Sequence, residues 1–215
     1  MTTAVLTPSI VADDVFNLEG ISWDTYMSLW QDLSESRRLK LTYYHGNLEI
    51  MSPSPEHEYY KRIIGRFIET LAEELDINIS PLGSTTFKLL GYGGAEPDDC
   101  FYIENIDLIR NVKKFKPDEA IPPDLILEID LISPSNERLK IYQELGVKEV
   151  WVYTRDGLQI LQLKNNEYIQ AENSIIFPNL PLLEIDNFMT QLDSIDYLDL
   201  VKMFRQWVRE KIHKD

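Results

Sequence analysis

The sequence has only one cysteine, no long apolar run and no excess of positive charge. The single cysteine, Cys100, excludes an internal disulfide and a zinc cluster built from several cysteines. It lies in a strand-like segment, so we interpret it as a buried structural thiol. No apolar run approaches the roughly 20 residues of a membrane helix. The opening MTTAVLTPSI lacks the charged start and apolar middle of a signal peptide. We therefore expect a cytoplasmic protein with no membrane partner.

The net charge of −15 opposes the basic surface that most nucleic-acid-binding proteins carry. Any surface that binds DNA must therefore be local. Four basic segments are candidates: residues 36–40, 60–66, 111–116 and 202–214. The last of these repeats Lys202, Arg205 and Arg209 along one face of an expected helix, which would suit DNA or a protein partner. Taken singly, each segment is better explained as a solvated charged face.

The 215 residues, 44% of them hydrophobic, are enough for one large globular domain. We predict an N-terminal tail over residues 1–20, an α/β domain over 21–186, and a C-terminal amphipathic helix over 187–215 that packs on the same domain. Hairpins are expected near residues 40–51 and 148–164, and an amphipathic helix over 56–75. Ser133, Pro134 and Gly146 mark the ends of another helix. The predicted fold class is α/β, a mixed β-sheet core flanked by helices.

The segment DLILEIDLIS, residues 124–133, reads as a buried strand that carries two acids. Alternate side chains point to opposite faces of a strand, so the leucines at 125, 127 and 131 share an apolar face with Ile129. The other face holds Glu128 and Asp130 between isoleucines. Burying two carboxylates is costly unless something neutralises them.

A second acidic segment, EPDD at residues 96–99, offers a partner for those acids. If Asp98 projects from a neighbouring strand, then Asp98, Glu128 and Asp130 form an oxygen-rich pocket. Mg²⁺ and Mn²⁺ prefer carboxylate oxygens, with water completing the shell. Such an ion would neutralise the buried charge, so we predict a metal site on these three residues.

These motifs resemble a known family. In order, GNLEIMSPSPEHE, EPD, PPDLILEIDLISPS and IYQELGVKEVWVY are similar to the Uma-two family, abundant in cyanobacteria, whose members are classed as restriction endonucleases of the PD-(D/E)XK superfamily. The resemblance runs from about Trp23 to Leu183. It implies a restriction-endonuclease-like fold, DNA as substrate, and Mg²⁺ or Mn²⁺ as cofactor. It is also compatible with a homodimer, since related enzymes often cut two strands with two copies.

By this resemblance, Asp98 and Glu128 match the two metal-binding acids of the motif. Glu58 matches an acid often supplied by the first core helix, and His57 is its rival. The motif lysine is missing: Asp130 stands at its position, and Arg138 stands where the family often displaces it. Arginine cannot deprotonate water, but it can orient a phosphate or stabilise its transition-state charge. Asp130 would hold a second ion or accept a proton.

Two functions follow from these residues. The first is a metal-dependent endonuclease that hydrolyses DNA phosphodiester bonds, and the intact Asp98 and Glu128 favour it. The second is a catalytically silent nuclease fold used for binding or oligomerisation. Asp130 and Arg138 in place of the lysine, together with the acidic charge, favour that alternative. A non-nuclease hydrolase using the same carboxylates is a third hypothesis.

Overall fold

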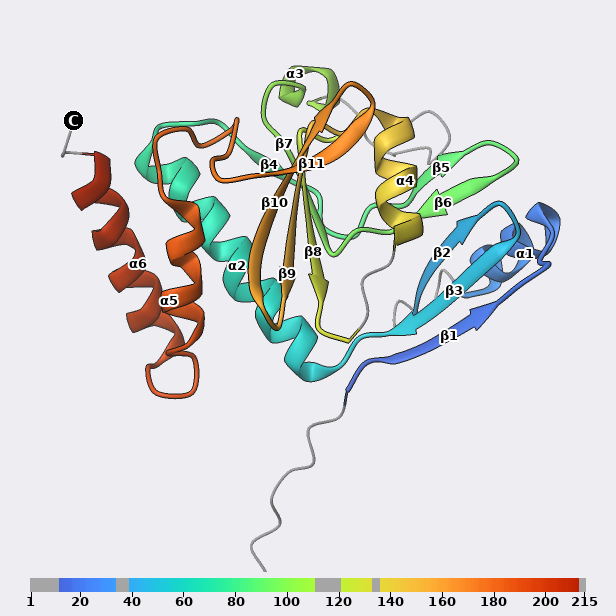
Figure 1. Ribbon diagram of the computed structural model, residues 1–215, viewed down its shortest axis with the longest axis horizontal. Coiled ribbons are helices and arrows are strands. Elements are labelled where there is room, and N and C mark those ends of the chain that lie inside the picture. The colour runs from blue at the N-terminus through green and yellow to red at the C-terminus, as the bar shows by residue number, and fades with distance from the viewer. Residues whose placement is uncertain (1–11, 34–38, 111–120, 133–135, 213–215) are drawn as a thin grey trace, which may run out of the picture.

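The computed structural model describes residues 12–33, 39–110, 121–132 and 136–212 (Figure 1). Several predictions fall outside this part of the chain: the tail over residues 1–11, most of the basic segments 36–40 and 111–116, and the helix start at Ser133 and Pro134. Among the described residues, no helix combines the length and the apolar character needed to cross a bilayer.

A five-stranded antiparallel sheet forms one side of the molecule. Its order is β1 (Asp14–Leu18), β3 (Asn47–Ser52), β2 (Lys40–Tyr44), β6 (Gly93–Ala95) and β5 (Phe87–Leu89). The predicted hairpin is β2–β3, and its two turn residues His45 and Gly46 have positive φ of 47° and 92°. Helix α1 (Trp23–Leu33) covers this sheet by packing Tyr26 on Tyr43. The tail prediction is wrong for Asp14–Leu18, because these residues pair with β3.

A six-stranded mixed sheet forms the centre. Its order is β11 (Glu167–Ala171), β10 (Gly157–Lys164), β9 (Glu149–Thr154), β8 (Leu125–Asp130), β7 (Asp99–Tyr102) and β4 (Ser80–Pro81). Neighbouring strands are antiparallel except β8 and β9, which are parallel. Helix α4 (Asn136–Leu145) makes the crossover between those two strands. The predicted hairpin in this region is β9–β10.

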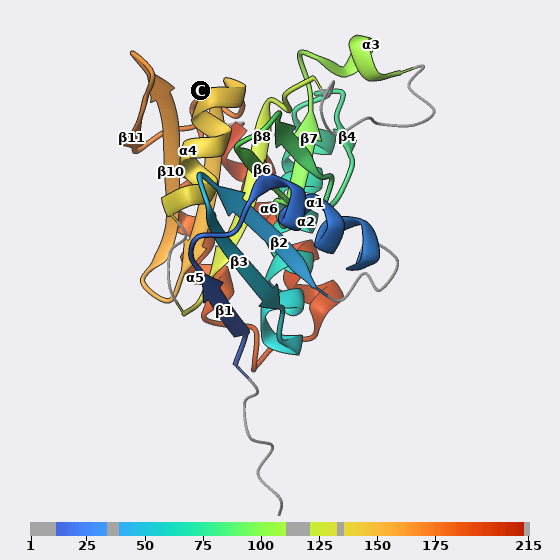
Figure 2. The ribbon, with the colours of Figure 1, turned by 90° about the vertical axis from the view of Figure 1, so that its right-hand side faces the viewer.

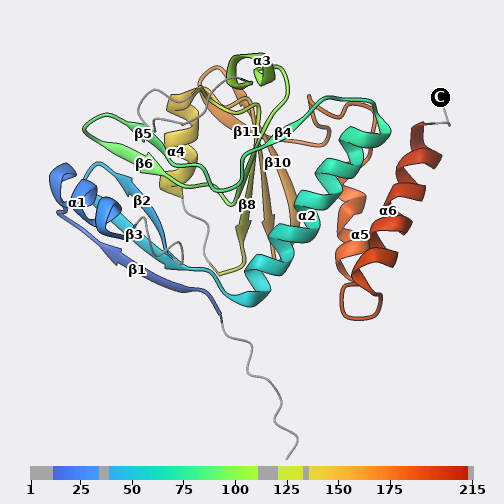
Figure 3. The same cartoon turned by 180° about the vertical axis from the view of Figure 1, so that it is seen from behind.

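Helix α2 (Pro55–Glu74) covers one face of the six-stranded sheet (Figure 3). The Ser54 hydroxyl caps it by accepting a hydrogen bond from the His57 backbone N–H at 3.1 Å. Its apolar stripe is buried against the leucine face of β8, as the sequence predicts. Helix α6 (Tyr197–Ile212) packs on the outer side of α2, with Phe204 stacked on Phe67 at 4.1 Å between ring centroids. Three short helices, α3 (Ile106–Ile109), η1 (Leu182–Glu184) and α5 (Ile185–Met189), complete the fold.

The opposite face of the six-stranded sheet meets α4 and the five-stranded sheet (Figure 2). Ile126 of β8 packs there with Ile141 and Tyr142 of α4. The two sheets are joined directly by residues 96–98, which connect the end of β6 to the start of β7. The acids of interest therefore lie where the two sheets converge. The predicted mixed sheet with flanking helices is confirmed.

Candidate active site

Strand β8 separates its two kinds of side chain as the sequence predicts. Leu125, Leu127 and Ile129 are fully buried in the core against α2. Glu128 is only 2% exposed and lies on the other face, toward α4. Buried carboxylates require compensating partners, so the contacts of these acids determine what the site can do.

Asp98 lies beside Glu128. Strands β7 and β8 pair Asp99 with Leu127, so the next pair along the antiparallel register is Asp98 and Glu128. Asp98 is 1% exposed. It accepts hydrogen bonds from His57 Nε2 at 2.7 Å, from the Ile129 backbone N–H at 2.7 Å, and from the Lys40 ammonium. Asp98 and Glu128 are therefore neighbours across the register, and Asp98 is already held by three donors.

His57 links two carboxylates. Its Nε2 faces Asp98, and its Nδ1 lies 3.2 Å from Asp13 Oδ2. A carboxylate accepts but does not donate, so both ring nitrogens must carry a proton and the ring is an imidazolium. Burial lowers the pKa of His57, but the hydrogen bond and charge of Asp98 outweigh it, so the pKa is raised. Asp13 also accepts from the Ser54 backbone N–H at 2.7 Å, which fixes the start of α2.

Glu128 and Asp130 share one cation. Arg138 Nη1 lies 3.1 Å from Glu128 Oε2, and Arg138 Nη2 lies 2.5 Å from Asp130 Oδ1. The Tyr142 hydroxyl donates to Glu128 Oε1 at 2.5 Å. Arg138 and Tyr142 are one turn apart on α4, so a single helix face contacts both acids. Arg138 is 4% exposed and lies on the α4 side of the acids.

The two central acids have opposite electrostatics. Burial alone would raise the pKa of Asp98, but Lys40 and His57 hold that pKa well below its usual range. Burial raises the pKa of Glu128 to about 8, because Arg138 offsets only part of the desolvation and the charge of Asp98 adds to it. Asp98 is therefore a stable carboxylate, and Glu128 holds its proton at neutral pH until a further cation arrives.

The structure does not bring Glu58 into this cluster. Its side chain is 48% exposed and pairs with Lys61 at 2.8 Å on the outside of α2. The adjacent His57 points inward and takes the place that the resemblance gave to Glu58. Glu58 instead lines a neighbouring cleft. The sequence raised His57 only as a rival and missed Lys40 and Asp13.

The basic segments on the described helices are largely committed to acids. Arg205 and Arg209 pair with Glu73 and Glu74 of α2, which ties α6 to α2. Arg66 pairs with Glu69 and Glu73, both at 3.1 Å. In this acidic chain, the arginines of α2 and α6 are therefore neutralised by neighbouring glutamates. The face of α6 is for that reason less suited to bind DNA than its sequence suggests.

The donor atoms fit a hard divalent cation held by two residues rather than three. Within the described ranges, no three His, Cys, Asp or Glu side chains are arranged to hold a metal, and Asp130 is paired with Arg138. Glu128 Oε2 is buried and accepts no hydrogen bond of good geometry. Among the described residues, its only cation contact is the ion pair with Arg138 Nη1 at 3.1 Å, so it keeps acceptor capacity on the face of β8 that Asp98 shares. Mg²⁺ is commonly bound by one or two carboxylates, with water and substrate phosphate completing its shell.

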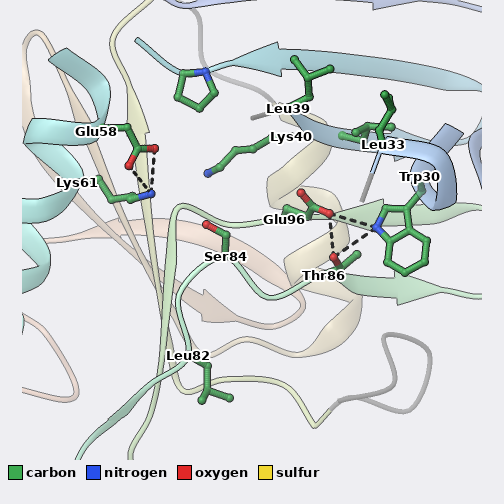
Figure 4. Close-up of a pocket in the computed structure, with 12 residues that line it drawn as sticks. Trp30, Leu33, Leu39, Lys40, Glu58, Lys61, Leu82, Ser84, Thr86 and Glu96 are labelled. Atoms are coloured by element: carbon green, nitrogen blue, oxygen red, sulfur yellow. Dashed lines mark hydrogen bonds and ion pairs between the residues drawn. The ribbon is translucent and has the colours of Figure 1, made fainter. Parts of the chain in front are cut away.

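A cleft of about 630 Å³ is lined by Lys40, the residue whose ammonium contacts Asp98 (Figure 4). The ammonium of Lys40 points into it, between the Glu58–Lys61 pair on one side and Glu96 on the other. Trp30 closes the far end, where its indole donates to Glu96 Oε1 at 3.2 Å. A smaller recess of about 290 Å³ shares part of this lining, including Ser84, and reaches Asp98. The recess thus reaches Asp98, although the side chain of this acid is itself buried.

A mixed α/β sheet flanked by helices, with one buried acid on β8 and another in the link before β7, agrees with a nuclease-like protein of the restriction-endonuclease type. The model of the Uma2 family, described as "Putative restriction endonuclease", matches residues 23–193, and the chain belongs to this family. No curated protein matches it. Among solved structures, it is similar to a "putative nuclease belonging to DUF820" from Anabaena variabilis ATCC 29413. The two are 14% identical, the match covers 86% of this chain and 99% of the other, and the TM-score is 0.49.

Proposed function

We propose that the protein is a metal-dependent endonuclease that hydrolyses DNA phosphodiester bonds, with Asp98 and Glu128 holding Mg²⁺ or Mn²⁺. The single observation that carries the proposal is the pair of buried carboxylates, Asp98 and Glu128, that the register of β7 and β8 sets opposite each other, with Glu128 Oε2 accepting no hydrogen bond from the described residues. Keeping a carboxylate there costs stability, because burial raises its pKa to about 8. A divalent ion would offset that cost. When bound, it would polarise a phosphate and lower the pKa of a water molecule.

The surrounding residues have positioning tasks in this proposal. Arg138 and Tyr142 fix the orientation of Glu128 from α4, and Asp130 keeps the guanidinium in place. His57, anchored by Asp13, holds the other carboxylate. Arg138 is buried behind the acids, so we assign it to the support of Glu128 rather than to contact with the scissile phosphate.

Calorimetric titration with MnCl₂ tests the metal site. We expect wild type to bind Mn²⁺, and Asp98→Asn and Glu128→Gln to lose binding. Glu104→Gln makes the same change of charge on a side chain that is 70% exposed and paired with Lys148, so it should bind as wild type does. No heat of binding for wild type would overturn the proposal.

A second candidate, a silent nuclease fold that binds or assembles, is favoured by one observation. Lys40 and Arg138 already pair with both acids, and arginine replaces the displaced motif lysine. Incubation of supercoiled plasmid with wild type, with and without Mn²⁺, separates the two. Nicked or linear product that requires both Mn²⁺ and Glu128 supports the enzyme. Mn²⁺ binding without any product, over several enzyme concentrations, supports the silent fold.

A further inference from the structure

We propose that Lys40 is the phosphate-binding lysine of this site and replaces the lysine that the family motif would supply from β8 or α4. This inference rests on the proposed function and deepens it, since it assigns a residue to the substrate and a direction of approach. Lys40 begins β2 of the five-stranded sheet and crosses to Asp98 of the other sheet. Asp130 and Arg138 occupy the two motif positions, and neither faces the cleft.

Lys40 lies at the junction between the acid and the cleft. Its side chain is 10% exposed, its ammonium contacts Asp98 Oδ1, and it lines the 630 Å³ cleft. Lysine is a compact point charge on a flexible four-carbon stem, so its ammonium can exchange partners while its backbone remains in β2. Arg138 has no such freedom, because its guanidinium is fixed between Glu128 and Asp130.

A cation bound by Asp98 would repel the ammonium that now pairs with it. The cleft, which Lys40 lines, is the open space into which its ammonium would then turn. A phosphate that enters the cleft would there meet a positive charge within reach of Asp98. Ser84, whose hydroxyl donates to the Asp98 backbone carbonyl at 3.2 Å, lies along the same wall and offers an additional polar contact. A phosphate bound in the cleft would therefore contact Lys40, the cleft residue whose ammonium also reaches Asp98.

The inference predicts two opposite effects of Lys40→Met. Mn²⁺ binding should tighten by about tenfold, because a competing charge a few ångströms away is removed. Plasmid cleavage should fall by about 100-fold, the usual cost of losing one group that stabilises a developing negative charge. Binding of a single-stranded 12-mer oligothymidylate, measured by fluorescence anisotropy with Ca²⁺ in place of Mn²⁺, should weaken in parallel. Lys148→Met removes a lysine paired with Glu104, outside the cleft, and should change none of these quantities.

A second variant distinguishes the loss of the Lys40 ammonium from a loss of folding. Lys40→Cys treated with 2-bromoethylamine regains an ammonium at nearly the native distance, and cleavage and 12-mer binding should return. The native Cys100 is fully buried and should not react, so treated wild type is the control. Melting curves by circular dichroism confirm that each variant is folded.

The outcomes are distinct. If wild type binds no Mn²⁺, the proposed function fails and this inference fails with it. If wild type binds Mn²⁺ and cleaves, but folded Lys40→Met cleaves and binds the 12-mer as wild type does, only the assignment of Lys40 is overturned. If aminoethylation of Lys40→Cys restores folding without restoring cleavage or 12-mer binding, Lys40 is merely structural and the assignment is likewise overturned.

Discussion

Replacing Glu128 by glutamine should stabilise the protein while removing its metal binding. Glutamine keeps the shape of the side chain, and its amide can still face both Arg138 and Tyr142. It removes a charge whose burial is costly, since burial raises the pKa of Glu128 from 4.5 to about 8. A residue that weakens the fold and yet holds a central position is the kind retained for chemistry.

The size of the effect depends on pH, and its sign follows from the raised pKa. Below pH 4.5 the folded and unfolded chains both carry the proton, so the variant and wild type should be equally stable. As pH rises from 4.5 toward 8, the unfolded chain releases the proton while the folded chain keeps it, and wild type loses stability. At pH 7 this amounts to at most about 3 kcal/mol. The amide does not reproduce every contact of the protonated acid with Arg138 and Tyr142, so we expect a gain of about 1–3 kcal/mol.

Urea unfolding of both proteins at pH 4.5, 6, 7 and 8.5 measures the difference. Glu149→Gln is the matched control on the neighbouring strand β9. Glu149 is equally buried, but its oxygens accept from Trp151, Ser174, Gln162 and the Ile175 backbone N–H. Its amide replacement should therefore destabilise by about 1–3 kcal/mol. A loss of stability for Glu128→Gln at every pH, or a gain that does not grow between pH 4.5 and 7, would refute the reasoning.

Three further predictions concern the fold around the site. Burial raises the pKa of Asp99 to about 6, so Asp99→Asn should be more stable than wild type at pH 7, by about 1–2 kcal/mol, and indistinguishable from it near pH 4 in urea unfolding. Ser54→Ala removes the cap of α2 and should cost about 1 kcal/mol; Ser54→Thr, which retains a hydroxyl, should cost less in the same assay. Gly94→Ala places a methyl group against the hydroxyl of buried Tyr26, and thermal unfolding should show a loss of about 1–3 kcal/mol; an unchanged melting temperature would contradict this packing.

Sequence periodicity was sufficient for the elements whose two faces differ. The leucine face of β8, the stripe of α2 and the two hairpins could all be predicted, because burial imposes a period of two or 3.6 on the residues. The proximity of Asp98 and Glu128 was also a prediction from the sequence, although Asp98 lies in the link just before β7 and not in a strand. Cys100 is fully buried, in agreement with its interpretation as a structural thiol.

The cations of the site could not be found in the same way. Lys40 is 58 residues from Asp98 and lies beside two arginines, in a segment that reads as a solvated face. Its burial depends on how the two sheets meet, which no local pattern encodes. His57 and Glu58 are adjacent on α2 and differ by about 100° around the helix axis. Only the packing of α2 decides which of them faces inward.

The cluster of acids and cations also connects the five-stranded sheet to the six-stranded sheet. Lys40 comes from the five-stranded sheet and Glu128 from the six-stranded sheet, while Asp98 belongs to the three-residue link between them. If a bound ion replaced the ion pair between Lys40 and Asp98, one of the contacts that hold the two sheets together would therefore be lost. Binding of the ion would then be thermodynamically linked to the relative position of the two sheets. The rate of amide hydrogen exchange in β2 and β7 should therefore change when the site is occupied.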